Sequence, residues 1–146
     1  MNQNKLTPKK SLNKAFLKQG IDRKTIENFK ENFDKLLNNT NDNESEEYNK
    51  NLIREFMNDS YYKNDFYINT TGRQDLVIHN GDNANTPVGV IIETKKITNK
   101  AEMVFCDNLN TKAMQELLWY FLNERIIKKL NILLFQMSMS GLFLMQ

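Results

Sequence analysis

The side chains best suited to chemistry lie in two short apolar segments near the middle of the chain. Glu93 is the last residue of the segment 88–93, and Lys95 follows it two residues later. If this segment is a β-strand, alternation places both side chains on the same face of the sheet. A carboxylate beside such an apolar run is costly to bury unless a cation neutralises its charge. Glu93 and Lys95 therefore mark a candidate site.

Asp75 begins the preceding apolar segment, 75–79, so pairing of the two strands brings it toward Glu93. Two carboxylates and a neighbouring ammonium group suit a hard divalent cation such as Mg²⁺, which prefers oxygen ligands. Such an ion activates water and neutralises the charge that develops on a phosphodiester, while Lys95 holds or polarises the attacking water. The alternative interpretation is an ordinary group of surface ion pairs.

Hydrophobic periodicity predicts the elements that would position this site. Apolar residues recur at helical spacing in the first 40 residues, which we interpret as a helical pair broken at Gly20, with Asp22 as an N-cap. The elements expected after it are a helix at 46–59, a meander of strands at 66–68, 75–79 and 88–93, a helix at 108–129 capped by Asn108, and a strand at 130–137. This order predicts an α+β fold, an α/β sandwich of helices against a sheet.

The acidic residues of the meander carry a resemblance to a known family. Asp75, followed after a hairpin-length gap by Glu93-Thr94-Lys95, resembles the Asp…Glu-x-Lys signature of the PD-(D/E)xK nuclease fold. The order helix, three strands, helix, strand is also similar to the core of that restriction-endonuclease-like fold. The resemblance implies a metal-dependent nuclease core.

A narrower resemblance covers most of the chain. Residues 6–130 resemble the endonuclease domain at the N-terminus of type IIG restriction–modification enzymes, which are bacterial fusions of an endonuclease and a methyltransferase. Gln74 departs from the proline in the superfamily's name, at a position that varies widely. The resemblance implies hydrolysis of phosphodiester bonds in double-stranded DNA.

The resemblance also implies a role for each residue of the site. Asp75 and Glu93 are expected to bind Mg²⁺, for which Mn²⁺ can substitute, and Lys95 is expected to orient water or stabilise charge. Glu46 is the expected third carboxylate, although Glu47 is almost equally well placed in the first turn of its helix.

The helix expected at 108–129 supplies the remaining candidates. A Gln or Glu followed four residues later by an aromatic residue is similar to an auxiliary motif of the superfamily, and Gln115 is assigned this role. Lys96, Lys100 and Lys112 are candidates for contacts with DNA phosphates, which would be salt-sensitive and not specific for sequence.

Composition restricts the other function classes. A length of 146 residues suits one domain, and a net charge of +2 is too small for a polybasic nucleic-acid coat. One cysteine, Cys106, and one histidine, His79, exclude a disulfide framework and a structural zinc site. We interpret Cys106 as an inert thiol and His79 as a strand-end or loop residue.

Targeting and cofactor signals are also missing from the sequence. No glycine-rich phosphate-binding motif occurs, so we expect no nucleotide cofactor. A membrane-spanning helix needs about 20 apolar residues, and no apolar run in the sequence approaches that length. We therefore expect a cytoplasmic protein with no membrane partner.

The chain divides into an N-terminal helical segment, 1–40, a nuclease-like core, 46–137, and a tail, 138–146. The uncharged end of the chain lacks the Asn and Lys bias of the rest, and a shifted reading frame over 135–146 gives a sequence that resembles a continuing core strand. We therefore expect a frameshifted, truncated domain that lacks methyltransferase and target-recognition parts. The alternative is a catalytically inactive DNA-binding or interaction module on the same fold.

Overall fold

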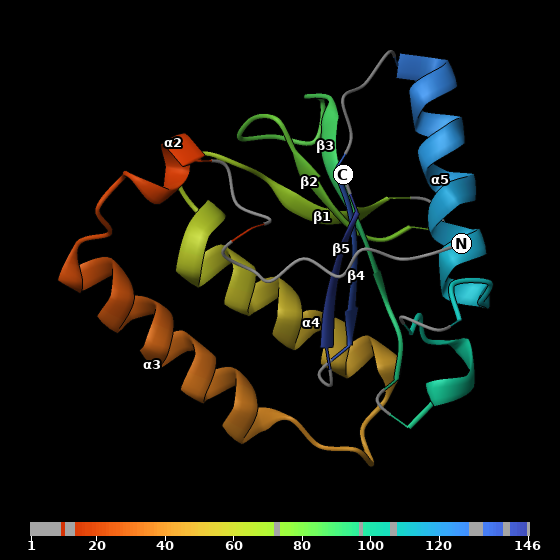
Figure 1. The fold of residues 1–146 in the computed structure, drawn as a ribbon, viewed down its shortest axis with the longest axis horizontal. Helices are drawn as coiled ribbons and strands as arrows, with labels where there is room; N and C mark the ends of the chain where they lie inside the picture. The colour runs from red at the N-terminus through yellow and green to blue at the C-terminus, as the bar shows by residue number, and fades with distance from the viewer. Residues whose placement is uncertain are drawn as a thin grey trace.

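Helices cover both faces of a mixed sheet in the computed structural model of the chain (Figure 1). The structure describes residues 10, 14–71, 74–96, 98–105, 108–128, 133–138 and 141–145. The helices are α2 (Lys14–Leu17), α3 (Arg23–Asn39), α4 (Glu46–Met57) and α5 (Lys112–Lys128), with a π-helical turn η1 (Asn58–Tyr62) and a 3-10 turn η2 (Lys100–Glu102). The strands are β1 (Ile68–Thr71), β2 (Gln74–His79), β3 (Val88–Thr94), β4 (Leu133–Ser138) and β5 (Gly141–Met145). The predicted α+β class is confirmed.

Side-chain caps determine where α3 and α4 begin. Asp22 Oδ1 accepts a hydrogen bond of 2.9 Å from the backbone N–H of Thr25, which confirms the predicted N-cap. Ser45 Oγ accepts one of 3.1 Å from the backbone N–H of Tyr48 at the start of α4. Each cap satisfies a backbone donor that the first turn of a helix leaves without a partner.

The sheet has the strand order β1-β2-β3-β4-β5. The first three strands form an antiparallel meander, β4 returns parallel to β3 after the α5 crossover, and β5 pairs antiparallel with β4. The register pairs Leu76 with Ile92 and Val77 with Ile91. Continued by one residue, this register places Asp75 opposite Glu93. The meander therefore brings the two carboxylates to one end of the sheet.

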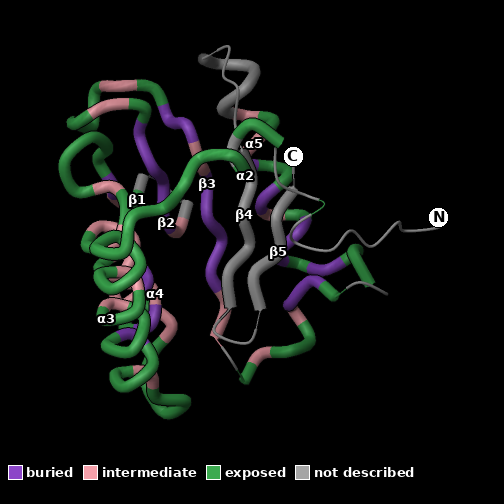
Figure 2. The backbone as a smooth tube through the Cα atoms, turned by 60° about the vertical axis from the view of Figure 1, so that its left-hand side comes forward, coloured by how far each residue is buried: buried purple, intermediate pink, exposed green. Residues whose placement is uncertain are grey.

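Alternation along β2 and β3 divides the core into two layers. On one face, Val77 and Ile91 pack with Leu117 and Tyr120 of α5. The other layer faces α4 and consists of Ile53, Ile68, Leu76, Ile78 and Ile92. Figures 1 and 2 show α3 and α4 on one side of the sheet and α5 on the other. Glu93 has the same parity as Ile91 and so belongs to the face that α5 covers.

The first strand begins later than the sequence predicts. The prediction was a strand at 66–68, whereas β1 starts at Ile68. The backbone N–H of Phe66 still donates to the carbonyl of Tyr62, at 2.9 Å, so the turn that follows η1 includes this residue. The helical hydrogen bonding of η1 thus delays entry into the sheet.

Helix α5 also begins later, at Lys112 instead of the predicted residue 108. Phe105 and Asn108 form an isolated antiparallel bridge, which holds the chain in a turn before the helix. Asn108 Oδ1 accepts a 3.2 Å hydrogen bond from the backbone N–H of Asn110, which still precedes α5, so it does not cap the helix. The prediction of Asn108 as N-cap was therefore wrong.

The ends of the chain are described in part. Of the predicted N-terminal helical pair, α3 and the short α2 are described, and the rest of the first helix lies outside the described residues. The prediction for Cys106 also falls outside them. In the tail 138–146, residues 141–145 form β5. Among the described helices, none combines the length and the apolar character that a membrane crossing requires.

The orientation of α5 can be tested with two neighbouring leucines. Leu117 is 1% exposed and packs on the sheet, whereas Leu118 is 40% exposed. We expect Leu117→Ala to lower the free energy of unfolding by about 2–5 kcal/mol. Leu118→Ala should change it by less than about 0.5 kcal/mol. Urea unfolding followed by circular dichroism measures both, and equal losses would contradict the orientation of α5.

Candidate functional site

Glu93 lies near the end of β3 with 2% of its surface exposed. Its Oε1 accepts a hydrogen bond of 2.5 Å from Lys95 Nζ, while its Oε2 is buried without a hydrogen-bond partner among the described residues. Burial raises the pKa of Glu93 to about 8; Lys95 opposes this increase, and the nearby Asp75 carboxylate adds to it. One oxygen of Glu93 is thus held by Lys95, and the nearby Glu116 carboxylate also adds to the raised pKa.

Lys95 joins the end of β3 to α5. Its Nζ also donates to Glu116 Oε2, at 2.9 Å, and 7% of its side chain is exposed. Burial by itself would lower the pKa of the ammonium group, but the hydrogen bonds to Glu93 and Glu116 outweigh it and raise the pKa. Partial burial acts to raise the pKa of Glu116, yet the contact with Lys95 lowers it overall. Lys95 is therefore a fixed positive charge between two acidic side chains.

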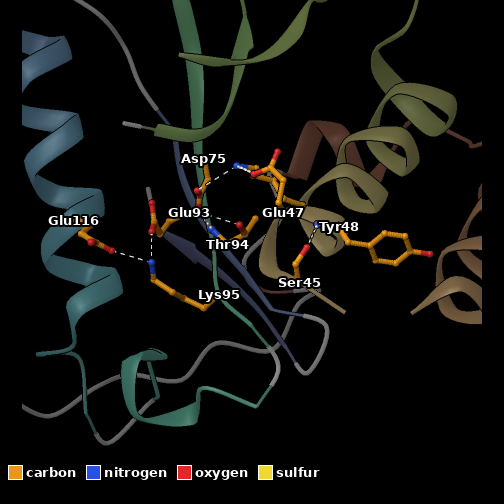
Figure 3. Close-up of polar contacts among 9 residues, drawn as sticks. Ser45, Glu47, Tyr48, Asp75, Glu93, Thr94, Lys95 and Glu116 are labelled. Carbon is orange, nitrogen blue, oxygen red and sulfur yellow. Dashed lines mark hydrogen bonds and ion pairs between the residues drawn. The ribbon is translucent and has the colours of Figure 1, made fainter. Parts of the chain in front are cut away.

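Asp75 lies on β2 and is oriented by Thr94 (Figure 3). Its Oδ2 accepts hydrogen bonds from the backbone N–H of Thr94, at 2.8 Å, and from Thr94 Oγ1, at 2.9 Å. Its Oδ1 lies 3.8 Å from Nζ of Lys50 on α4, and Lys50 also forms an ion pair with Glu47. Strands β2 and β3 and the helices α4 and α5 thus all contribute side chains to this cluster of charged residues.

The structure brings together Asp75, Glu93 and Lys95, which we call the carboxylate site. It does not bring Glu46 into this group. Among the described residues, no three carboxylate, imidazole or thiol groups converge closely enough to hold a metal ion. From α4 it is Lys50, and not Glu46, that lies beside Asp75.

Gln115 does not face the carboxylate site, contrary to the sequence prediction. It is exposed, and its Nε2 donates a 2.9 Å hydrogen bond to Asn110 Oδ1. The physical reason is the rotation of α5. Leu117 and Tyr120 turn toward the sheet, which leaves Gln115 on the opposite side of the helix.

Glu116 is the residue of α5 that reaches the site, and the sequence prediction missed it. Glu116 is followed four residues later by Tyr120, just as Gln115 is followed by Trp119. The same motif therefore fits two neighbouring registers. Tyr120 is 8% exposed and Trp119 is 54% exposed, so packing selects the register of Glu116 and Tyr120.

Lys50 was also missed, and nothing local in the sequence connects it with Asp75. The only local signal is its spacing of three residues from Glu47, which is typical of an ion pair on a helix surface. Its position beside the carboxylate site follows from the way α4 packs against β2.

His79 belongs to the sheet and not to the carboxylate site. It is the last residue of β2, at the opposite end of the strand from Asp75, and is 3% exposed. Its Nδ1 donates to the carbonyl of Thr86, at 2.7 Å, and its Nε2 lies 3.0 Å from Asn69 Oδ1. The interpretation of His79 as a strand-end residue outside the site is confirmed.

The carboxylate site has the donor chemistry of a site for a hard cation. Asp75 and Glu93 provide carboxylate oxygens, the ligands that Mg²⁺ and Mn²⁺ prefer. The buried Oε2 of Glu93 has no described hydrogen-bond partner, and coordination would satisfy this atom. Asp75 and Glu93 therefore offer two carboxylates of the type that a divalent cation prefers, without a third carboxylate, imidazole or thiol group converging on them among the described residues.

Comparison with known proteins identifies the family of the chain. Residues 6–136 match the model of a family described as "Domain of unknown function (DUF7149)". The chain belongs to the DUF7149 family. The match includes every residue of the carboxylate site. No curated protein and no solved structure matches this DUF7149 chain.

The raised pKa of Glu93 predicts how stability depends on pH. The folded protein keeps a proton on Glu93 up to about pH 8, whereas the unfolded chain releases it near its ordinary value of 4.5. The folded state therefore binds more protons between these values, and this group's contribution to the free energy of unfolding falls as the pH rises through this window. We expect Glu93→Gln to remove this slope, measured by urea unfolding from pH 5 to 8.5.

The matched control is Glu47→Gln, which changes a glutamate whose side chain is 63% exposed. This variant should keep the pH slope of the unchanged protein. If Glu93→Gln and the unchanged protein show the same slope, Glu93 does not titrate with a raised pKa.

Proposed function

We propose that this DUF7149 chain is a metal-dependent DNA endonuclease domain of the PD-(D/E)xK type, similar to the nuclease domains of type IIG restriction–modification enzymes. The observation that carries the proposal is the meeting of Asp75, Glu93 and Lys95 at one end of the sheet. The two carboxylates come from adjacent strands, and Lys95 donates to Glu93 at 2.5 Å. These are the residues that match the signature of that nuclease fold.

The arrangement of elements gives a second, independent argument. Helix α4, strands β1 to β3, helix α5 and strand β4 follow the order of the nuclease core. Helix α4 packs on one face of the sheet and α5 on the other, so the carboxylate site lies between the two helices (Figure 3). At this end of the sheet the Asp75 side chain is 19% exposed, whereas the side chains of Glu93 and Lys95 are buried behind it.

Asp75 and Glu93 are the residues that would hold Mg²⁺ or Mn²⁺. Asp75 is preorganised for this by Thr94, which fixes the carboxylate through two hydrogen bonds to Oδ2. A bound divalent cation would neutralise phosphate charge and lower the pKa of a water molecule bound to it.

Lys95 places a positive charge next to these carboxylates. Its ammonium group is fixed between Glu93 and Glu116, so it requires little reorganisation to stabilise negative charge on a phosphodiester. Glu116 acts through Lys95 and is therefore a positioning residue. Lys112 pairs with Glu102 at 3.5 Å and lies 4.0 Å from Glu116, so one of the three lysines suggested for phosphate contacts is already engaged in ion pairs.

Nicking of supercoiled plasmid DNA tests the proposed activity. We expect the purified chain to nick plasmid only with Mg²⁺ or Mn²⁺, and Asp75→Asn and Glu93→Gln to lose at least about 100-fold of the rate. Glu55→Gln changes an exposed carboxylate of α4 outside the site and should leave the rate unchanged. Circular dichroism establishes that each variant is folded.

The outcomes separate the proposed enzyme from its alternative. A folded protein that binds double-stranded DNA saturably but never nicks it is a non-catalytic binding module on the same fold. A folded protein that neither nicks DNA nor takes up Mn²⁺ overturns the proposal. Nicking that persists in both carboxylate variants would place the activity elsewhere.

The choice between the two registers on α5 gives a further prediction. We expect Glu116→Ala to reduce the nicking rate by about 10-fold, because Lys95 loses one of the carboxylates that position it. Gln115→Ala, one residue away, should keep the rate of the unchanged protein. The affinity for DNA should change little in either variant, as measured by fluorescence anisotropy with Ca²⁺ in place of Mg²⁺. If only Gln115→Ala reduces the nicking rate, Gln115 and not Glu116 has the auxiliary role, as the sequence analysis assigned it.

A further inference from the structure

Lys50 is a second lysine beside the carboxylate site, and the chemistry proposed above does not use it. It lies in the second turn of α4, and 13% of its side chain is exposed. Its Nζ pairs with Glu47 and lies 3.8 Å from Asp75 Oδ1. An ammonium group that is so little exposed needs carboxylate partners to offset its lost hydration. Glu47 and Asp75 are the two carboxylates that balance the charge of Lys50 in this position.

The two oxygens of Asp75 have different partners. Thr94 donates two hydrogen bonds to Oδ2, which fixes the orientation of the carboxylate. Oδ1 is the oxygen that remains for a cation, and it is the one that lies near Lys50. The corresponding oxygen of Glu93, Oε2, has no hydrogen-bond partner among the described residues. A cation that binds between the two carboxylates therefore meets Lys50 on the Asp75 side.

The contacts of the two lysines with the site differ in length. Lys95 is held by hydrogen bonds of 2.5 Å to Glu93 and 2.9 Å to Glu116. Lys50 lies 3.8 Å from Asp75, beyond hydrogen-bond distance, and its closer partner is Glu47. Displacement of Lys50 from Asp75 thus breaks no hydrogen bond, and Glu47 still balances its charge. Lys50 can therefore be displaced from Asp75, whereas Lys95 is held in position by two hydrogen bonds.

We propose that Lys50 is the built-in counter-ion of Asp75 in the metal-free site and competes with a divalent cation for that carboxylate. The inference rests on the nuclease function proposed above, because it assigns a regulator to the same site. Repulsion between the ammonium group and a neighbouring divalent cation lowers the affinity of the site for the cation. Lys50 thereby sets the concentration of metal at which the site fills.

Titration of the full chain with MnCl₂ by isothermal calorimetry tests this competition. We expect Lys50→Met, which keeps an unbranched apolar side chain but removes the charge, to bind Mn²⁺ about tenfold more tightly than the unchanged protein. Lys50→Gln is a second neutral variant with the same expectation. Lys50→Arg keeps the charge and should remain within about twofold of the unchanged protein.

Lys35→Met is the matched control for the change in net charge. Lys35 lies on α3, and its Nζ is also 3.8 Å from a carboxylate oxygen, Asp59 Oδ2. This pair is remote from the carboxylate site and 58% of the Lys35 side chain is exposed. Lys35→Met should therefore bind Mn²⁺ with the affinity of the unchanged protein.

The outcomes distinguish this inference from the proposed function. If the unchanged protein binds Mn²⁺ saturably and the folded neutral variants at position 50 bind it equally or more weakly, Lys50 is not a competitor, and the nuclease proposal stands. If Lys35→Met tightens binding as much as Lys50→Met, the effect is one of net charge and the inference is overturned. If no folded variant takes up Mn²⁺, both proposals fail together.

Discussion

The contact between Glu93 and Lys95 is the interaction on which the rest of the site depends. A carboxylate with 2% of its surface exposed is unfavourable in the core, and the ammonium group of Lys95 at 2.5 Å offsets only part of that cost, so the pKa of Glu93 stays raised. Lys95 in turn needs Glu116, which couples the end of β3 to α5. The same chain of charges therefore constrains the position of α5 and the ionisation of Glu93.

The two helices make different contributions to this end of the sheet. From α5 comes Glu116, whose carboxylate keeps Lys95 fixed, and from α4 comes Lys50, whose ammonium group lies loosely beside Asp75. Helix α5 thus contributes a negative charge that is hydrogen-bonded to Lys95, and α4 contributes a positive charge that lies 3.8 Å from Asp75. The proposed nuclease chemistry uses Lys95, and the inferred competition with metal uses Lys50.

Much of the fold and part of the site could be predicted from local sequence patterns. The order of helices and strands, the Asp22 cap and the α+β class follow from periodicity and capping. The prediction was wrong at the start of α5, where local hydrogen bonds before the helix replaced the expected cap. The bridge between Phe105 and Asn108 delays α5, and Asn108 then bonds within the turn instead of capping the helix.

The sequence by itself determined that Glu93 and Lys95 share one face, because alternation along a strand is a local property. Only the tertiary structure decided that Glu116 and Lys50, and not Gln115 and Glu46, lie beside them. The rotation of a helix about its axis is set by packing when apolar residues occur on several of its faces. On α5, Leu118 and Trp119 are as apolar as the buried Leu117 and Tyr120, so the pattern alone leaves the rotation open.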